Sequence, residues 1–238
     1  MISKISLPEH PDFNNGEVLL IDKAPDWTSF DVVKSLKLFL KFNFGIKKIK
    51  IGHAGTLDPK ATGLVIVCTG KKTKEIDSYQ AREKEYTGTF RLGQTTPSYD
   101  TETQPDAEFP TGHIDEDLLK ETTQKFLGEI FQVPPVFSAV KIEGRKAYEY
   151  ARKSEAVKMR TRLVEIMEFE ITDVQMPYVD FRVRCSKGTY IRSLAYDFGL
   201  ALSSGAYLSA LRRTAIGEFR VEDALDVQAF KKAYRSEG

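Results

Sequence analysis

The chain has 238 residues, 41% of them hydrophobic, and its 35 basic residues nearly balance its 34 acidic ones. This length supports one substantial core and could hold one large domain or two small ones. The net charge of +1 does not by itself indicate a polyanionic partner. The longest apolar run, residues 64–68, is far too short to cross a bilayer. We therefore expect neither secretion nor membrane insertion, and we predict a cytoplasmic protein.

In chain order, the first half of the sequence predicts strands, helices and two polar loops. The predicted elements are a strand over 17–21, a helix from Thr28 or Ser29 to Phe42, a loop over 52–63, a strand over 64–68, a helix over 70–78, a strand over 85–92, a loop over 93–112 and a helix over 115–126.

The second half continues the mixture without a strict β-α-β alternation, which favours an α+β fold over a doubly wound sheet. The predicted elements are strands over 140–142, 163–172 and 178–185, a tyrosine-rich helix over 145–153 between the first two, a helix over 190–200, strands over 207–211 and 216–220, and a last short helix from Val227.

Cysteine and histidine are too scarce to build a metal site or a disulfide framework. Cys68 and Cys185 lie far apart in strand-like apolar runs and form no CxxC pair. The three histidines, His10, His53 and His113, show no HExxH spacing. We therefore predict no metal and no disulfide.

The loop over 52–63 is the most unusual stretch of the sequence. Its glycines permit tight turns and close approach of the backbone, and it presents His53 and Asp58 five residues apart. Such a loop can hold a base against His53 and place Asp58 beside a sugar carbon. The alternative is a structural turn in which Asp58 caps the segment that begins at Pro59. Local chemistry leaves both interpretations open.

A second candidate segment, residues 186–193, follows a predicted strand and leads into a predicted helix. Junctions of this type often line clefts. Arg192 can pair with a carboxylate and keep it ionised, and Tyr190 can pack on a ring. The alternative is an ordinary buried ion pair with a core tyrosine. Tyr86, on the strand over 85–92, is a third candidate, and its default interpretation is a half-buried strand aromatic.

Basic residues gather in several short clusters. Each cluster alone is typical of a solvated face, whereas several that converge would follow the phosphates of a nucleic acid. The clusters are Lys47, Lys48 and Lys50; Lys71, Lys72 and Lys74; Lys141, Arg145 and Lys146; and Lys158, Arg160 and Arg162.

Residues 52–63, Gly-His-Ala-Gly-Thr-Leu-Asp-Pro-Lys-Ala-Thr-Gly, closely resemble the signature of the TruB family of tRNA pseudouridine synthases. Further matches follow in order over about residues 17–220. They are Asp22-Lys23 with Thr28-Ser29, Glu85-Tyr86-Thr87-Gly88, Arg91-Leu92-Gly93, Pro134 to Lys141, Gly188 to Leu194, and Leu211-Arg212-Arg213-Thr214.

The resemblance implies an enzyme that converts uridine 55 in the T loop of tRNA to pseudouridine without a cofactor. It makes Asp58 the catalytic aspartate, His53 the residue that fills the place of the flipped base, and Tyr86 the ring that stacks on the uracil. The N1 to C1′ bond is broken, the uracil turns while bound, and it is rejoined through C5. Asp58 can attack C1′, attack C6 or abstract the C2′ proton, and these three routes stay open.

The resemblance also supplies the surroundings of Asp58. It implies that Arg192 pairs with Asp58, that Tyr190 lines the pocket, and that Lys23 and Leu211 support it. Residues 24–27 depart from the family pattern, in which Lys-Pro-x-Gly is typical. The turn that holds Lys23 is therefore expected to differ.

The implied architecture is a pseudouridine synthase fold with a mixed, largely antiparallel sheet, flanking helices and a central RNA-binding cleft. Residues 1–222 are expected to form the catalytic domain, and 223–238 a short helical tail without the PUA domain of many relatives. The expected partner is the tRNA T arm, bound by a monomer. Two alternatives are a noncatalytic tRNA-folding chaperone and a pseudouridine synthase that acts on another RNA site.

Overall fold

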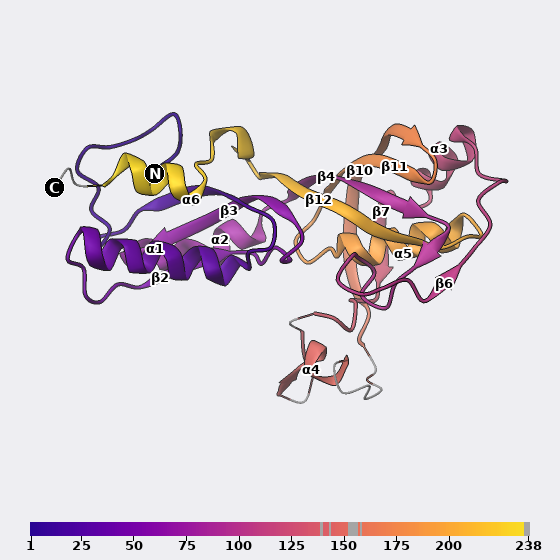
Figure 1. The fold of residues 1–238 in the computed structure, drawn as a ribbon, viewed down its shortest axis with the longest axis horizontal. Coiled ribbons are helices and arrows are strands. Elements are labelled where there is room, and N and C mark those ends of the chain that lie inside the picture. The colour runs from indigo at the N-terminus through magenta and orange to yellow at the C-terminus, as the bar shows by residue number, and fades with distance from the viewer. Residues whose placement is uncertain (139, 143, 152–156, 158, 236–238) are drawn as a thin grey trace. The chain divides into compact units, whose positions relative to one another are not determined.

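The computed structural model describes residues 1–138, 140–142, 144–151, 157 and 159–235. The chain forms two compact units (Figure 1). The first unit consists of Met1–Tyr86 and Arg212–Gly238, and the second of Thr87–Leu211. Strands β4 (Lys84–Leu92) and β12 (Ala206–Ile216) each begin in one unit and end in the other.

In the first unit, β3 pairs antiparallel with β1 and β2 and parallel with β12, which also pairs antiparallel with β13. The elements of this unit besides β4 and β12 are β1 (Val18–Lys23), α1 (Ser29–Asn43), β2 (Ile51–Ala54), β3 (Thr62–Thr69), the 3₁₀ helix η1 (Gly70–Glu75), α2 (Ile76–Ala81), β13 (Phe219–Arg220), the 3₁₀ helix η2 (Val221–Asp223) and α6 (Val227–Ala233).

Helix α1 begins where the sequence predicts. The Thr28 side chain accepts a hydrogen bond from the Asp31 amide, and the Asp31 carboxylate accepts one from the Thr28 amide, which is a complete capping box. The buried face of the helix consists of residues at helical spacing, among them Val32, Leu36 and Leu40.

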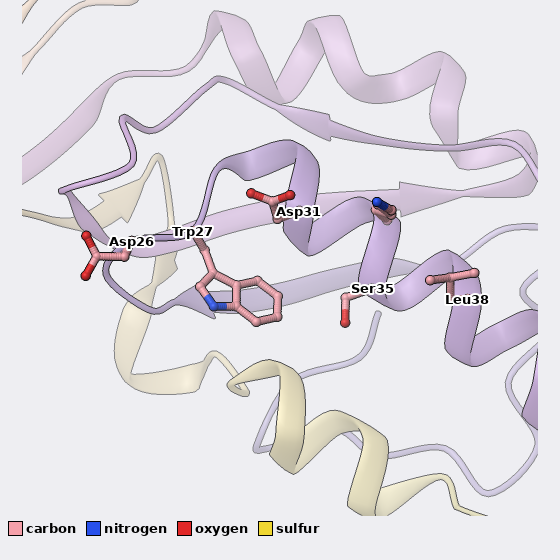
Figure 2. A pocket seen from close by; sticks show the side chains of 6 residues that line it. Asp26, Trp27, Asp31, Ser35 and Leu38 are labelled. Atoms are coloured by element: carbon pink, nitrogen blue, oxygen red, sulfur yellow. The ribbon is translucent and has the colours of Figure 1, made fainter.

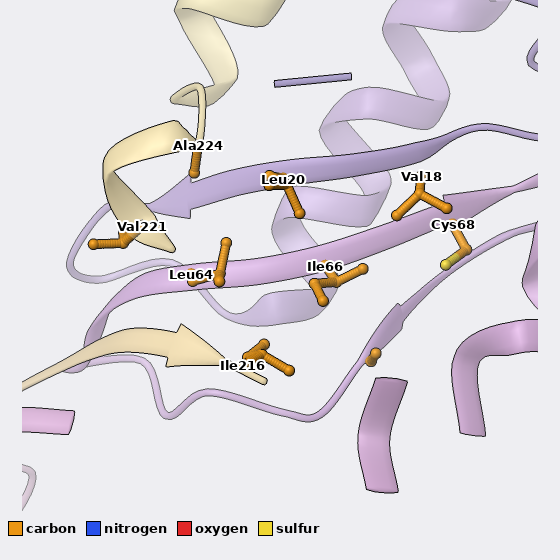
Figure 3. Close-up of a cluster of buried hydrophobic side chains, with 9 residues drawn as sticks. Val18, Leu20, Leu64, Ile66, Cys68, Ile216, Val221 and Ala224 are labelled. Carbon is orange, nitrogen blue, oxygen red and sulfur yellow. The ribbon is translucent and has the colours of Figure 1, made fainter. Parts of the chain in front are cut away.

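Small and branched apolar side chains fill the core of the first unit between β1, β3 and the C-terminal segment (Figure 3). Strand β3 is buried over nearly its whole length, as expected for a central strand. The buried cluster comprises Val18, Leu20, Ala54, Leu64, Ile66, Cys68, Ile216, Val221 and Ala224.

The second unit has a largely antiparallel sheet in the strand order β12-β4-β11-β10-β7. Strand β10 pairs antiparallel with both β11 and β7. The elements of this unit besides β4 and β12 are β5 (Gln94–Thr95), β6 (Ala107–Glu108), α3 (Glu116–Gln124), β7 (Gly128–Gln132), β8 (Lys141–Ile142), β9 (Arg145–Lys146), α4 (Ala147–Ala151), β10 (Arg162–Gln175), β11 (Tyr178–Cys185) and α5 (Ile191–Ala201).

Aromatic rings dominate the core of this second unit. Phe90 and Phe181 stack with ring centroids 4.0 Å apart, and Phe198 of α5 lies 5.4 Å from both Phe90 and Phe169. These contacts fix α5 on the sheet, because aromatic pairs contribute directional packing in addition to buried area. The predicted α+β class is confirmed.

Three sequence predictions were wrong in detail. The loop over 52–63 is shorter, because residues 51–54 pair with β3 as β2, and β3 itself begins at Thr62. The strands predicted over 207–211 and 216–220 are largely one strand, β12, which turns only after Ile216. The helix predicted over 70–78 is a 3₁₀ helix followed by the short α2.

Two further differences concern the middle of the chain. Strand β7 (Gly128–Gln132) was not predicted, since its alternation is short and its edge position leaves it largely exposed. The tyrosine-rich helix begins at Ala147, two residues later than predicted, because Arg145–Lys146 form β9, and its described part extends to Ala151. Its predicted end at Lys153, and Lys158 of a basic cluster, lie outside the described residues. In the described part of the chain, no helix is long and apolar enough to cross a membrane.

Candidate active site

Asp58 is half-buried in the segment that joins β2 to β3, and we call residues 55–61 the site loop. The residue before it, Leu57, is tied to helix α1. The buried Ser29 hydroxyl accepts a hydrogen bond from the Leu57 amide at 2.9 Å and donates one to the Leu57 carbonyl at 3.3 Å. The first turn of α1 therefore fixes the backbone on one side of Asp58.

The residue after Asp58 is held from β1 by Lys23. The fully buried Lys23 ammonium donates to the Pro59 carbonyl at 3.1 Å, and also to the carbonyls of Ala24 at 3.0 Å and Trp27 at 2.6 Å. Three carbonyl oxygens satisfy all three donors of an ammonium group. The expected support of the site by Lys23 therefore has a structural basis in main-chain hydrogen bonds.

Burial lowers the pKa of Lys23 to about 8. Loss of hydration is the main cause, the positive charge of Arg213 acts in the same direction, and the negative charge of Asp58 opposes both. Lys23 therefore remains mostly protonated near neutral pH, and its charge interacts with that of Asp58.

The turn over residues 24–27 holds Lys23 although it lacks the usual Lys-Pro-x-Gly pattern. Asp26 takes a left-handed conformation with φ of 63°, which aspartate tolerates better than most residues. Its amide donates to the Pro59 carbonyl at 2.9 Å, and its carboxylate pairs with Lys60 at 2.7 Å. The turn therefore adds a second link to the site loop.

Trp27 presents its carbonyl to Lys23 and its indole to helix α1 (Figure 2). The indole lines an open pocket of about 390 Å³ whose other walls include acidic, basic and apolar side chains. These are Asp26, Asp31, Lys34, Ser35 and Leu38. The pocket therefore lies between the turn over residues 24–27 and the first turns of α1.

His53 lies half-buried on β2, opposite Val67 of β3. Burial lowers its pKa, and the positive charge of Arg213 contributes in the same direction. The backbone of Gly55 acts in the opposite sense, although it does not reach hydrogen-bond geometry with Nδ1, which has no partner among the described residues. His53 is therefore a neutral ring near neutral pH.

Arg213 of β12 is buried and contacts the backbone of the site loop. Its guanidinium donates to the carbonyls of Leu64, Gly55 and Thr56. From the sequence, Arg213 was noted only as part of the family match Leu211-Arg212-Arg213-Thr214, and no role was predicted for it. Its position between the two strands predicted over 207–211 and 216–220 gave no sign that its side chain is buried.

Tyr86 is 8% exposed on β4, within the first unit. The adjacent Glu85 accepts a hydrogen bond from the Thr214 hydroxyl at 2.8 Å, which ties β4 to β12 one residue after Arg213. The first unit thus contains four of the predicted site residues: Lys23, His53, Asp58 and Tyr86.

In the second unit, Gln132 of β7 fixes Tyr190 at the start of α5. The buried Gln132 amide accepts from the Tyr190 backbone amide at 2.7 Å and donates to the Tyr190 carbonyl at 3.0 Å. The Tyr190 ring lies 5.5 Å from the Arg162 guanidinium. Leu211, the last residue of this unit, is half-buried on β12.

Arg192 is buried beside a carboxylate, as in the alternative interpretation of this segment, but its partner Asp100 was not predicted. Its Nη1 donates to the carbonyls of Phe137 at 2.9 Å and Ser98 at 3.2 Å, and its Nε lies 3.6 Å from Asp100 Oδ2. Asp100 in turn accepts from the Ser98 hydroxyl at 2.6 Å. Asp100 was missed because the polar loop over 93–112 also contains Asp106, Glu102 and Glu108, and nothing in the sequence distinguishes one of these carboxylates.

The predicted pairing of Arg192 with Asp58 stays a prediction, since it joins residues of different units. Among the described residues, no group of three or more histidine, cysteine, aspartate and glutamate side chains gathers in a way that could hold a metal ion.

Comparison with known proteins assigns the class. The fold is that of pseudouridine synthases, and the chain is an isomerase. It is similar to a chain in the crystal structure of a Cbf5-Nop10-Gar1 complex, with a TM-score of 0.70 and 32% identity. The aligned region covers 92% of this chain and 54% of that chain. An archaeal box H/ACA sRNP Nop10-Cbf5 complex matches with a TM-score of 0.68 and 28% identity, over 95% of this chain and 57% of that chain. The chain thus spans about half the length of these solved chains.

Two family models match adjacent parts of the chain. The TruB family pseudouridylate synthase N-terminal domain covers residues 41–191, and the tRNA pseudouridylate synthase B C-terminal domain covers residues 192–237. The chain belongs to the TruB family of pseudouridylate synthases. It is 56% identical to tRNA pseudouridine synthase B of Flavobacterium johnsoniae, over 93% of this chain and 97% of that protein. It is 51% identical to the same enzyme of Phocaeicola vulgatus, over 92% and 93%.

Proposed function

We propose that this protein isomerises uridine to pseudouridine at position 55 in the T loop of tRNA, with Asp58 as the catalytic carboxylate. Relatives of nearly the same length carry the name tRNA pseudouridine synthase B. The substrate class follows from these relatives, and the choice of position 55 follows from the resemblance of residues 52–63 to the family signature.

The observation that carries this proposal is the immobilised backbone around Asp58. Leu57 is fastened by Ser29, and Pro59 by Lys23 and the Asp26 amide. A carboxylate that must act on one sugar or base atom needs such fixed geometry, because effective molarity depends on alignment. A plain surface turn requires no buried lysine to hold its carbonyls.

The reaction breaks the bond between N1 and C1′ of the uridine and forms a bond between C5 and C1′, while C5 loses its hydrogen as a proton and N1 gains one. Asp58 serves as nucleophile at C1′ or C6, or as the base that removes the C2′ proton. Each route uses the ionised carboxylate.

The remaining site residues handle the flipped nucleotide. His53, as a neutral half-buried ring, fills the space that the uracil leaves. Tyr86 stacks on the uracil, and Tyr190 and Leu211 line its pocket. Stacking offsets part of the few kcal/mol that base extrusion costs.

The decisive experiment uses a T-arm stem-loop with tritium at C5 of its uridines, because the isomerisation releases that hydrogen to water. The protein is expected to release one equivalent at position 55, and Asp58→Asn to release none while still binding the RNA. Intact conversion by Asp58→Asn would remove Asp58 from the mechanism.

The same experiment separates two alternatives. A noncatalytic chaperone would release no tritium but would accelerate refolding of unmodified tRNA. An enzyme for another RNA site would leave the stem-loop unchanged, and pseudouridine mapping across the RNAs of a deletion strain would reveal its target.

A further inference from the structure

Arg213 lies at the point where both ends of the segment that carries Asp58 come together. Its side chain is 1% exposed. Its Nη2 donates to the Gly55 carbonyl at 3.2 Å and its Nη1 to the Thr56 carbonyl at 3.5 Å, both before Asp58. Its Nε donates to the Leu64 carbonyl at 2.7 Å, after Asp58. One guanidinium thus bridges the start of the site loop and the strand β3 that follows the loop.

The main chain of Arg213 touches the same segment. Arg213 is in parallel register with Gly63 on β3. Gly63 has φ of +107°, and a Cβ atom there would lie 2.3 Å from the Arg213 carbonyl oxygen. Backbone and side chain of one residue therefore contact positions 55, 56, 63 and 64.

The chemistry of the contact explains why an arginine is present. All its hydrogen-bond acceptors among the described residues are main-chain carbonyls. A rigid, planar fork of donors can reach carbonyls on two sides at once, whereas a lysine ammonium is a compact point of charge. Burying a guanidinium is costly, so its retention here indicates a demand for geometry.

We propose that Arg213 is a positioning residue that aims the carboxylate of Asp58 by fixing the separation between the start of the site loop and strand β3, which follows the loop. This inference rests on the proposed function, since it assigns Arg213 a part in that reaction. Arg213 does not touch the reacting atoms. It acts through the carbonyls of residues 55, 56 and 64.

The adjacent Arg212 offers a matched control. It points to the other side of β12, where its Nη2 lies 2.7 Å from Asp22 Oδ2, and its side chain is 41% exposed. Both arginines belong to the same strand of the same unit. The two substitutions therefore remove equal charge and similar volume and differ in which side of the strand they affect.

The experiment compares Arg213→Met, Arg213→Lys and Arg212→Met in the full-length protein. The single-turnover rate constant on the T-arm stem-loop is expected to fall about 100-fold in Arg213→Met, the size of effect that a misplaced catalytic group produces. The Kd for the RNA is expected to stay within about threefold, because the lost interaction acts on the chemical step. Arg213→Lys should recover part of the rate, and Arg212→Met should keep it.

A second readout reports the charge of Arg213 at the site. The chain has three histidines, so the ring signal of His53 can be followed in an NMR titration. Its pKa is expected to rise in Arg213→Met and to stay unchanged in Arg212→Met, because Arg213 is the charge that lowers it. A variant that is merely less stable would leave this pKa unchanged.

The outcomes are distinct. The inference is overturned if the folded Arg213 variants keep a normal single-turnover rate constant, or if their loss of activity comes entirely from a weaker Kd for the RNA. In either case conversion by the wild-type protein still supports the proposed function. If neither Arg213 variant folds, Arg213 is a residue of the fold and the positioning role is wrong. If the wild-type protein converts no uridine in tRNA, the proposed function itself fails.

Discussion

The two units bury cations in different ways. In the first unit, Lys23 and Arg213 donate to main-chain carbonyls, three for each side chain. In the second unit, Arg192 donates to two carbonyls and also lies beside the carboxylate of Asp100. Carbonyl dipoles hold a cation in place without neutralising it, whereas a carboxylate does both. The first unit thus keeps positive charge beside the site loop.

Burial also shifts the pKa of one charged side chain in each unit. It lowers the pKa of Lys23 to about 8 in the first unit and raises the pKa of Asp197 on α5 to about 6 in the second. In each case loss of hydration is the leading cause and disfavours the charged form. Both groups are charged between these two values, which includes neutral pH.

The largest effect on the free energy of unfolding is expected where a buried cation loses its carboxylate partner. Asp100→Asn leaves Arg192 with a neutral neighbour, and both side chains are less than a tenth exposed. The free energy of unfolding, measured by urea titration, is expected to fall by about 4 kcal/mol. Glu102→Gln, on an exposed neighbour, is the control. A loss below about 1 kcal/mol would mean that main-chain carbonyls are enough to stabilise the buried cation in the second unit, as they are in the first.

The next effect tests the close contact of Arg213 with β3. Gly63→Ala would place a methyl group 2.3 Å from the Arg213 carbonyl oxygen, on a residue with positive φ. A loss of about 3 kcal/mol in unfolding free energy is expected from strain and overpacking together. Gly45→Ala is the matched control, because Gly45 has φ of +67° with nothing within 4 Å. It should lose only about 1 kcal/mol. Equal losses would show that the backbone conformation alone matters.

The smallest effect concerns the pH dependence of the second unit. The pKa of Asp197 is about 6 in the folded protein, against 3.8 as the ordinary value. The folded state therefore binds more protons between these values, and this group reduces stability as the pH rises from about 4 through about 6. Solvent screening at this half-buried site reduces the effect.

Asp197→Asn removes that dependence. The variant should be more stable than the wild type above pH 6 and equal to it near pH 4, when unfolding is measured at several pH values. Asp173→Asn, on an exposed residue of β10, should show no such crossing. A constant difference at every pH would assign the effect to packing.

Local sequence signals predicted much of the secondary structure. The cap residues Thr28 or Ser29 predicted the start of α1, and the apolar run over 178–185 predicted the bounds of β11. The continuous strand β12 was not predictable, since Arg212, Arg213 and Thr214 interrupt the apolar pattern. Their polar side chains are accepted there because Asp22, three carbonyls and Glu85 receive their hydrogen bonds.

The sequence alone determined the family and the fold class and selected Asp58 as the candidate catalytic residue, because these depend on a contiguous motif and on ordered matches along the chain. Only the tertiary structure decided what holds Asp58 in place. Its neighbours are fastened by Ser29, Lys23 and Arg213, in hydrogen bonds that span 28, 36 and up to 158 residues of sequence. Acceptors of this kind are main-chain carbonyls, which every residue carries. No pattern of side chains can indicate them, and only the path of the folded backbone brings them to a buried donor.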